Sequence, residues 1–494
     1  MLELNALKVL LYGVVLAVSS EKETSSSWIN KNKDRIIGIS DEIWELAELG
    51  LIEFRSSKIL ADELERNGFK VERGVAGMPT AFVASWGSSK PVLGILGEFD
   101  ALPGLSQKKV PTKEPLHLGK PGHGCGHNVH GASGMAAAVA VKNAMQKHRI
   151  GGTVKFFGCP AEENYNGKVF LVREGALSGV DAVLSHHPSD MNCAVLKSCL
   201  SLDNVRFSFF GRSAHAGGSP HQGRSALDAV ELMNVGVNYM REHMIQDARV
   251  HYIVEKGGTQ PNIVPDYARS WYYVRAPERG QVEYLYKWVL DIAEAAAKMT
   301  RTEMKYESMG GLYNLIPNKV IAEKITGNMR EIGVPKYDEE DLEFANKISS
   351  SIPPEMKYEE MKESRRPNWE RLLDKLMDDE VADPWGEGMV SHGSTDVADV
   401  SWQMPAVEFN TATWVLGTPG HSWQNVAQSG VGLGHKSLIF AAKVMAATGI
   451  DLLTDAEILK KAKKEYKRRL AGKEYKCPLP SGAQPPLDIW EKSA

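Results

Sequence analysis

Residues 134–158 read GMAAAVAVKNAMQKHRIGGTVKFFG, a run that passes from a helix pattern into a strand pattern. Ala and Gly dominate the first part, which predicts a small-residue helix from Gly134 to Met145, and the second part predicts a strand from Val154 to Gly158. Helices that alternate with short apolar strands are typical of an α/β sheet. Further apolar runs of strand length lie at 81–86, 92–96 and 182–184.

Toward the N-terminus, the chain shows a helical region preceded by an apolar leader. Apolar residues recur at helical spacing from Trp28 until Asn67-Gly68 supplies a stop signal, so we expect two helices there. Residues 9–18, VLLYGVVLAV, have the length of a signal-peptide core and are too short to span a bilayer as a mature helix. We assign residues 1–24 to a possible signal peptide. The protein is exported if this segment is cleaved, and a cytoplasmic protein with a short leader is the alternative.

Beyond Leu202 the pattern changes in a way that predicts an inserted α+β domain. NVRFSFFGR, from Asn204, alternates like a half-buried strand, and a helix at 226–241, a strand at 268–274 and a helix at 282–299 follow it. After that segment the mixed pattern returns and ends in a predicted helix at 436–447. The predicted organisation is a discontinuous catalytic domain at 25–200 and 312–447, a lid domain at 201–311, a charged surface insertion at about 336–383 and a tail at 448–494.

Composition excludes several classes of protein. The chain has 494 residues, is 43% hydrophobic and carries a formal net charge of −4, so it is an ordinary globular protein without the basic field that nucleic acid or an anionic membrane attracts. Its 5 cysteines are too few and too scattered for a disulfide framework. A small polar substrate fits these properties better.

The densest chemical signal is PGHGCGHNVH, which begins at Pro121 and places Cys125 and His127 among glycines. Thiolate and imidazole are the ligands best suited to zinc and similar divalent ions, and glycines let the backbone bring them together. A second signal is the pair Glu162 and Glu163, directly after the apolar strand, where one carboxylate can bind metal while its neighbour faces substrate. Taken alone, the first segment is also compatible with a turn carrying incidental histidines, and the second with surface charge.

Two further signals follow apolar segments. His186-His187-Pro188 comes after the strand at 182–184, and His421 lies in the loop GTPGHSWQ. Sites in α/β proteins are generally built at strand ends. Four such signals in one chain predict a metal site there.

The ordered motifs resemble a known superfamily. GEFDALPG, GHGCGHN, PAEEN, HHP, GRSAHAGGSPHQGRSALDAVELMN, GGTQPNIVPDYA and HGSTDVADVSWQMP are similar to motifs of the metal-dependent amidohydrolase and carboxypeptidase G superfamily, and within it to the aminobenzoyl-glutamate hydrolase B-type amidohydrolases. The resemblance covers roughly residues 28–447. Asn128 stands where the auxin-conjugate and hippurate amidohydrolases have aspartate, and the B-type chains share it.

The resemblance implies a two-domain metallo-amidohydrolase, with an α/β catalytic domain and an inserted α+β domain that serves as lid and dimerisation domain. It implies that Glu162 is the general base, that Asp100 orients a ligand, and that Glu98 is not a ligand. The cofactor it implies is a pair of divalent ions, zinc or manganese. The implied ligands are Cys125, His127, Glu163, His187 and His421, with Cys125 bridging the two ions.

From the inserted domain, the resemblance implies three contacts to the substrate. His215 of a partner subunit stabilises the oxyanion, while Asn262 and Arg275 hold the substrate carboxylate. The implied reaction is hydrolysis of an N-acyl amino acid, above all p-aminobenzoyl-glutamate to p-aminobenzoate and glutamate. Other N-acyl amino acids or dipeptides remain alternatives, as does a metal-containing binding component of a heteromeric complex. The expected partners are a second copy of the chain or a related A-type chain.

Overall fold

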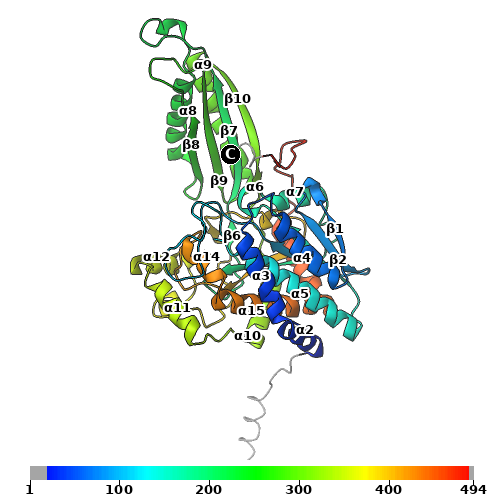
Figure 1. Ribbon diagram of the computed structural model, residues 1–494. Helices are drawn as coiled ribbons and strands as arrows, with labels where there is room; N and C mark the ends of the chain where they lie inside the picture. The colour runs from blue at the N-terminus through cyan, green and yellow to red at the C-terminus, as the bar shows by residue number, and fades with distance from the viewer. Residues whose placement is uncertain (1–18, 489–494) are drawn as a thin grey trace, which may run out of the picture.

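The computed structural model describes residues 19–488, which form a six-stranded sheet, a four-stranded sheet and one short two-stranded sheet (Figure 1). The apolar leader at 9–18 lies outside the described residues. The lower body in Figure 1 holds the larger sheet, and a second domain of strands and two long helices projects from it. This arrangement confirms the predicted α/β class with an inserted α+β unit.

The larger sheet has six strands in the order β1-β2-β4-β3-β5-β12. Strands β4, β3, β5 and β12 run parallel, and β2 is antiparallel to β4. The carboxyl ends of the four parallel strands therefore meet at one edge, which is where an α/β sheet places its site. The strands are β1 (Lys70–Arg73), β2 (Phe82–Gly87), β3 (Val92–Glu98), β4 (Thr153–Cys159), β5 (Ala182–Ser189) and β12 (Ala406–Ala412).

Helix α5 (His127–His148) packs directly on this sheet because its side chains are small. A Cβ on Gly131 would lie 2.6 Å from the Glu98 carbonyl oxygen, and one on Gly134 would lie 2.7 Å from that of Leu96. The glycines thus let the helix backbone approach β3 more closely than any other residue would allow. This contact fixes the N-terminus of α5, with its metal-ligand motif, at the carboxyl end of β3.

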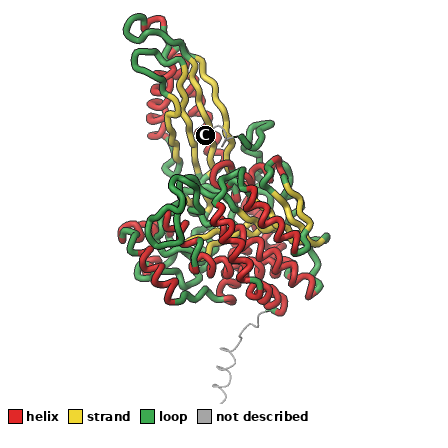
Figure 2. The backbone as a smooth tube through the Cα atoms, viewed as in Figure 1, coloured by secondary structure: helices red, strands yellow, loops and turns green. Residues whose placement is uncertain are grey.

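The remaining helices surround the sheet (Figure 2). They are α2 (Ser20–Lys31), α3 (Lys33–Leu46), α4 (Phe54–Arg66), α6 (Glu162–Tyr165), α7 (Gly167–Arg173), α10 (Lys319–Ile332), α11 (Glu339–Ser349), α12 (Pro354–Ser364), α13 (Val397–Ser401), α14 (Trp423–Ser429), α15 (Gly432–Thr454) and α16 (Ala456–Leu470). Short 3₁₀ turns occur at Val75–Gly77, Pro220–Gln222, Arg241–His243 and Trp369–Leu372, and β6 (Ser198–Cys199) pairs with β11 (Val390–Ser391).

The lid domain is a four-stranded antiparallel sheet in the order β10-β7-β9-β8. Its elements are β7 (Ser201–Phe210), α8 (Ala226–Met240), β8 (Arg249–Lys256), β9 (Tyr267–Ala276), α9 (Arg279–Thr300) and β10 (Glu303–Leu312). Alternate residues of β9 are buried against the two helices, which cover one face of the sheet. The other face is not covered by either helix.

Several boundaries differ from the sequence prediction. The helical region that begins the catalytic domain has three helices instead of two, and residues 20–24, assigned to the leader, form the first turn of α2. Lys22 there pairs with Asp451 at 3.0 Å. At the other end, the last predicted helix extends to Thr454, and α16 packs into the main core through Leu459 and Ala462, so this part of the predicted tail is folded onto the catalytic domain.

Two other segments bear on the predictions. Among the described residues, Gly432–Thr454 is long and apolar enough to cross a membrane, but 78% of its most apolar window is buried inside the fold, as in a core helix. The charged insertion at 336–383 carries α11 and α12. The insertion is tied to the catalytic domain by Asp378, which accepts a hydrogen bond from the Asn192 backbone N–H and pairs at 2.5 Å with Arg366 of the same insertion.

Candidate active site

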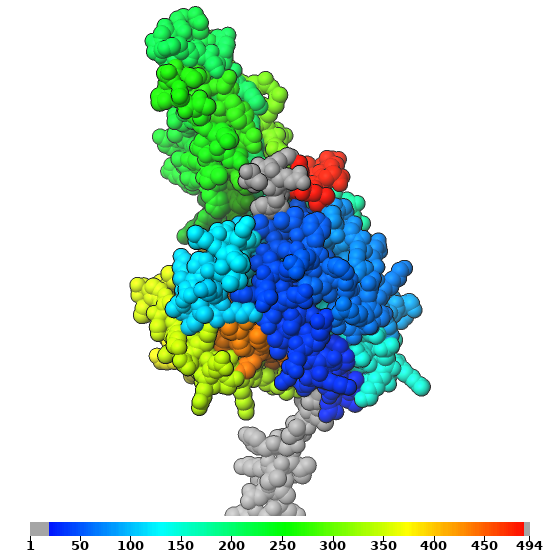
Figure 3. Space-filling model, viewed as in Figure 1, coloured from blue at the N-terminus to red at the C-terminus, as the bar shows by residue number. Residues whose placement is uncertain are grey.

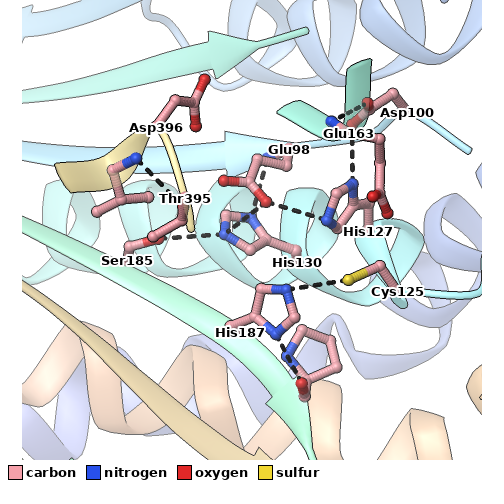
Figure 4. Close-up of polar contacts among 12 residues, drawn as sticks. Glu98, Asp100, Cys125, His127, His130, Glu163, Ser185, His187, Thr395 and Asp396 are labelled. Carbon is pink, nitrogen blue, oxygen red and sulfur yellow. Dashed lines mark hydrogen bonds and ion pairs between the residues drawn. The ribbon is translucent and has the colours of Figure 1, made fainter. Parts of the chain in front are cut away.

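The predicted metal ligands of the catalytic domain converge at the carboxyl edge of the parallel strands (Figure 4). Cys125 and His127 lie at the N-terminus of α5, Glu163 lies in α6 shortly after β4, and His187 lies near the carboxyl end of strand β5. His421 lies in the loop between β12 and α14. Segments far apart in the sequence thus supply one cluster, because parallel strands end at the same edge.

Cys125, His127 and His187 form one group of possible ligands, with their ligand atoms within 4.8 Å of one another. The Cys125 Sγ lies 3.3 Å from His187 Nε2. The Nδ1 of His187 donates to the carbonyl oxygen of Pro188 at 2.7 Å, which leaves Nε2 as the nitrogen with the free lone pair. Two imidazoles and a thiolate are a donor set that suits zinc and other borderline divalent ions.

Cys125, Glu163 and His421 form a second group of possible ligands. The Nε2 of His421 lies 3.5 Å from Glu163 Oε2, and the other carboxylate oxygen of Glu163 is buried without a hydrogen-bond partner. A buried carboxylate oxygen left unpaired is costly unless a cation completes it. The two groups share Cys125, so the residues present fit two neighbouring divalent ions, and the Cys125 sulfur would be within reach of both.

Asp100 lies beside the cluster and orients two of its members. Its Oδ1 accepts a hydrogen bond from His127 Nδ1 at 2.8 Å, and its Oδ2 accepts one from the Glu163 backbone N–H at 3.0 Å. The first bond fixes the tautomer of His127 and turns Nε2 toward the cluster. The second holds the turn that carries both glutamates, where Ala161 has a left-handed backbone with φ of 59°.

The charges of the site follow from its burial. Burial, together with the charge of neighbouring His127, lowers the pKa of His187 to about 4, so that imidazole is neutral and able to bind metal. Burial raises the pKa of the Cys125 thiol, and the Glu163 carboxylate raises it further. Such a thiol ionises only when a strong positive charge lies against the sulfur, and a bound divalent ion supplies that charge.

Glu162 is half-buried next to the cluster, on the turn between β4 and α7. Burial raises its pKa well above the ordinary value, and the carboxylates of Glu98 and Asp396 raise it further. A carboxylate oxygen of Glu162 lies within 4.8 Å of ligand atoms of Glu98 and His127, so this carboxyl is close enough to the cluster to be a candidate general base.

Sequence reasoning missed a buried ion-pair network behind Glu162. The Lys168 ammonium is fully buried and lies 2.5 Å from a carboxylate oxygen of Glu98 and 2.5 Å from one of Asp396. Glu98 also lies 3.1 Å from His127 Nε2, and its backbone N–H donates to His130 Nδ1. Asp396 belongs to the motif HGSTDVADVSWQMP, but a lone lysine in the apolar run GKVFLVR carries no sequence signal of its own.

The structure places two of the three lid residues, His215 and Asn262, at one end of the lid sheet and the third, Arg275, at the other end. His215 and Asn262 are exposed and adjacent, because the Ala216 backbone N–H donates to the Asn262 carbonyl, and both lie beyond the distal ends of β7 and β9. Arg275 lies at the opposite end of β9, near the junction with the catalytic domain. The ten residues of β9 span about 30 Å, so Asn262 and Arg275 of one chain do not meet.

Comparisons with known proteins agree with this geometry. The model of peptidase family M20/M25/M40 matches residues 94–448. The chain belongs to this family. It is 39% identical over 469 residues to the B-type chain of the p-aminobenzoyl-glutamate hydrolase of Escherichia coli (strain K12), a match that covers 92% of this chain and 97% of that relative. It is 28% identical over 475 residues to the Xaa-Arg dipeptidase of Homo sapiens, which covers 92% of this chain and 94% of the relative.

Two solved structures share the fold of this M20/M25/M40 chain at low identity. One is the aminobenzoyl-glutamate utilization protein from Klebsiella pneumoniae, with a TM-score of 0.56, 16% identity and coverage of 86% of this chain and 97% of that one. The other is a dinuclear metal-binding peptidase of the M20 family from Bacillus subtilis, with a TM-score of 0.55, 18% identity and coverage of 86% and 99%. Family membership and the ligand cluster together make this chain a metallo-hydrolase that acts on amide bonds.

Proposed function

We propose that this M20/M25/M40 hydrolase binds two divalent ions, zinc or manganese, and cleaves the amide bond of N-acyl amino acids, with p-aminobenzoyl-glutamate as the preferred substrate. The observation that carries the proposal is the pair of ligand groups that share Cys125, with the Glu162 carboxyl close to His127 of the first group. The 39% identity to one chain of a p-aminobenzoyl-glutamate hydrolase supports the choice of substrate.

Cys125, His127 and His187 would hold one ion, and Cys125, Glu163 and His421 the other. Ions held there would supply Lewis acidity, which lowers the pKa of water and polarises a carbonyl oxygen. The thiolate favours zinc, while the carboxylate and imidazoles suit either metal. Asp100 keeps the His127 ring in the tautomer that leaves Nε2 free for coordination.

Glu162 would accept the proton of the attacking water and then donate it to the leaving amine. Burial and two neighbouring carboxylates hold its pKa high in the absence of cations, so its affinity for a proton is large. Because Glu162 and Glu163 are adjacent in α6, the same short helix positions the proposed base and one of the proposed ligands.

His215 would stabilise the oxyanion from the lid of a second protomer. Its Nδ1 accepts hydrogen bonds from the backbone N–H groups of Gly217 and Gly218, at 3.1 and 2.9 Å. These bonds require the proton to sit on Nε2, so the exposed side of the ring presents a hydrogen-bond donor. A donor is what a developing oxyanion needs.

A partner protomer would also reunite Asn262 with Arg275 at one substrate carboxylate. Within a chain the two lie at opposite ends of the lid sheet, so a shared carboxylate requires the distal loop of one chain to reach the base of another. β8 is an unpaired edge of that sheet, and α8 exposes an apolar stripe of Leu232, Val235 and Tyr239. Both features suit a lid-to-lid dimer, either of two copies or with a related A-type chain.

The location of the protein depends on its leader. We propose that the protein is exported if residues 1–24 are cleaved as a signal peptide, and that it stays in the cytoplasm if they are not.

The deciding experiment is hydrolysis by the purified chain alone, loaded with zinc or with manganese. We expect kcat/KM to be highest on p-aminobenzoyl-glutamate and lower on hippurate and simple dipeptides. Activity that appears only after addition of an A-type chain would assign a heteromer. Preference for dipeptides would favour the second candidate, a dipeptidase, which the 28% identity to Xaa-Arg dipeptidase supports. No hydrolysis of any compound by the metal-loaded chain would leave the alternative of a binding component in a heteromeric complex.

A further inference from the structure

The uncovered face of the lid sheet carries an ordered array of aromatic and cationic side chains. On β9 every second residue points to this face, and the series from the distal end is Tyr, Arg, Trp, Tyr, Arg. These residues are Tyr267, Arg269, Trp271, Tyr273 and Arg275. Sheet faces left to solvent normally carry polar or charged residues. A row of large rings with no helix over it therefore indicates that this face binds another molecule.

Trp271 and Tyr273 form the centre of the array. Their rings are nearly perpendicular, with centroids 6.0 Å apart and an interplanar angle of 81°. His251 on β8 stands against Tyr273 from the other side, again 6.0 Å away. Together with Ile253 these side chains line a hollow of about 250 Å³. A benzene ring fits a cavity of about 150 Å³, so the hollow is large enough for one aromatic ring.

Neighbouring polar groups hold the Trp271 ring in place. The indole N–H donates to the Asn204 side-chain oxygen, and the Arg206 guanidinium stacks on the indole at 4.5 Å from its centroid. Arg206 in turn pairs with Glu255 at 3.1 Å. An aromatic ring held by two such contacts binds a flat ligand with little loss of side-chain entropy.

Arg275 lies at the edge of this array and lacks an acidic partner among residues 19–488. Its guanidinium lies 5.5 Å from the Tyr273 centroid, and its Nε is buried without a hydrogen bond. Burial lowers its pKa, as expected for a cation held away from water without a counter-ion. The cross-strand neighbour is Arg249, a second cation. This end of the array therefore suits an anion.

The array also approaches the candidate active site. Tyr165 ends the short helix α6 that begins with Glu162. Burial raises the pKa of Tyr165, while Arg206 and Tyr273 are close enough to act on it electrostatically, Arg206 lowering this pKa and Tyr273 raising it. The middle of the array thus lies near the end of the helix that carries the proposed base. Figure 3 shows the lid projecting from the catalytic domain.

We propose that Trp271 and Tyr273, with His251 at their flank, form the subsite for the aromatic acyl group of the substrate, next to the carboxylate site at Arg275. The inference rests on the proposed amide hydrolysis and adds the residues that select an aroyl over an aliphatic acyl group. An aromatic ring would lie on Tyr273 and against the edge of Trp271. The subsite is distinct from the metal ligands and sets specificity without taking part in bond cleavage.

The test compares two substrates that share the amino acid and differ only in the acyl group, p-aminobenzoyl-glutamate and N-acetyl-glutamate. For Trp271→Ala we expect kcat/KM to fall about tenfold on the aroyl substrate and by less than about twofold on the acetyl one. Trp271→Phe retains a ring and should recover most of the aroyl rate. Tyr306→Ala is the matched control, because Tyr306 is an exposed aromatic residue of the same sheet on its helix-covered face, opposite Phe207. It should match the parent on both substrates.

Equal losses on both substrates, or no loss on either, would overturn the subsite. So would dissociation of an oligomer by Trp271→Ala in light scattering, since that result would make the array a contact between protomers. If the parent hydrolyses neither substrate, the proposed function fails, but the subsite is still tested by equilibrium binding of N-benzoyl-glutamate and N-acetyl-glutamate. Tighter binding of the benzoyl compound that Trp271→Ala abolishes supports it, and equal binding of the two compounds overturns it.

Discussion

A single sulfur atom joins the two halves of the candidate metal centre. Cys125 belongs to both ligand groups, and its thiol is held neutral by burial and by the nearby Glu163 unless a cation lies against it. Loss of Cys125 would therefore affect both of these ligand groups, whereas loss of any one histidine would affect only one of them. Binding of a divalent ion is therefore coupled to deprotonation of the Cys125 thiol.

We predict that Cys125→Ser lowers retention of both ions, because a serine hydroxyl at this position is far harder to ionise than a thiol. Metal content after dialysis against a weak chelator should fall from two ions per chain to fewer than one. Cys193→Ser is the matched control, since Cys193 is also buried but lies outside both ligand groups. Two tightly held ions in Cys125→Ser would remove the bridging role.

Glu162→Gln should keep both ions and lose activity by about 10²- to 10⁴-fold, because the amide preserves the shape of the side chain but cannot accept a proton. Metal analysis and kcat are measured on the same preparation. A variant with full metal content and near-normal turnover would show that another group is the base.

At the scale of elements, the turn from β4 through α6 to α7 is held by buried charges. Lys168 in α7 joins Glu98 at the end of β3 to Asp396 before α13. Burial opposes its charge, but the two carboxylates raise the pKa of Lys168 well above its ordinary value, so the ammonium stays charged. The base-bearing turn is thereby fixed to two other segments of the sheet edge.

Lys168→Met should lower the free energy of unfolding by about 3 to 5 kcal/mol, because it removes the ammonium that pairs with the buried Asp396 carboxylate and leaves Glu98 with only the imidazoles of His127 and His130 beside it. Urea denaturation of the metal-free protein measures this change. Adding Glu98→Gln and Asp396→Asn to Lys168→Met should recover part of the loss, since neutral amides cost less to bury. Lys58→Met is the control, an exposed helix lysine whose loss should cost less than about 0.5 kcal/mol. Equal losses from Lys58→Met and Lys168→Met would contradict the network.

The contact between α5 and β3 gives a second prediction at this scale. Gly134→Ala should destabilise the protein by about 1 to 3 kcal/mol, because its Cβ would lie 2.7 Å from the Leu96 carbonyl oxygen and push the helix off the sheet. Gly38→Ala, in the exposed part of α3 with no atom within 4 Å of the new Cβ, should instead stabilise by about 0.5 to 1 kcal/mol. Thermal unfolding of the two variants should therefore shift in opposite directions, and shifts of the same sign would argue against the close approach.

At the scale of the whole molecule, the lid separates residues that the proposed reaction needs together. His215 and Asn262 lie beyond the distal end of the sheet, while the metal ligands lie below its base (Figure 1). If His215 and Asn262 act as proposed, a complete site requires a distal loop from another protomer. Mixing experiments test that requirement directly.

We predict that His215→Ala and Glu162→Gln, each nearly inactive alone, recover activity when mixed under conditions that allow exchange of protomers. One site of a mixed dimer combines an intact Glu162 with an intact His215, so recovery should approach about a quarter of the parent activity for random pairing. Glu162→Gln mixed with the double variant Glu162→Gln/His215→Ala is the control and should stay inactive. Absence of recovery despite proven exchange would mean that His215 does not act across protomers.

The sequence alone determined the α/β class and the type of metal site. Small residues from Gly134 to Met145, apolar strands with ligands at their ends, and the order of motifs were sufficient, because these features depend on local pattern and residue chemistry. Tertiary structure decided the rest. Only the fold shows that Lys168 is buried between two carboxylates, that Asn262 and Arg275 lie at opposite ends of β9, and that the rings of Trp271 and Tyr273 face an uncovered side of the sheet. The physical reason is that burial, pairing of charges and separation depend on which distant segments pack together, and no local pattern records that.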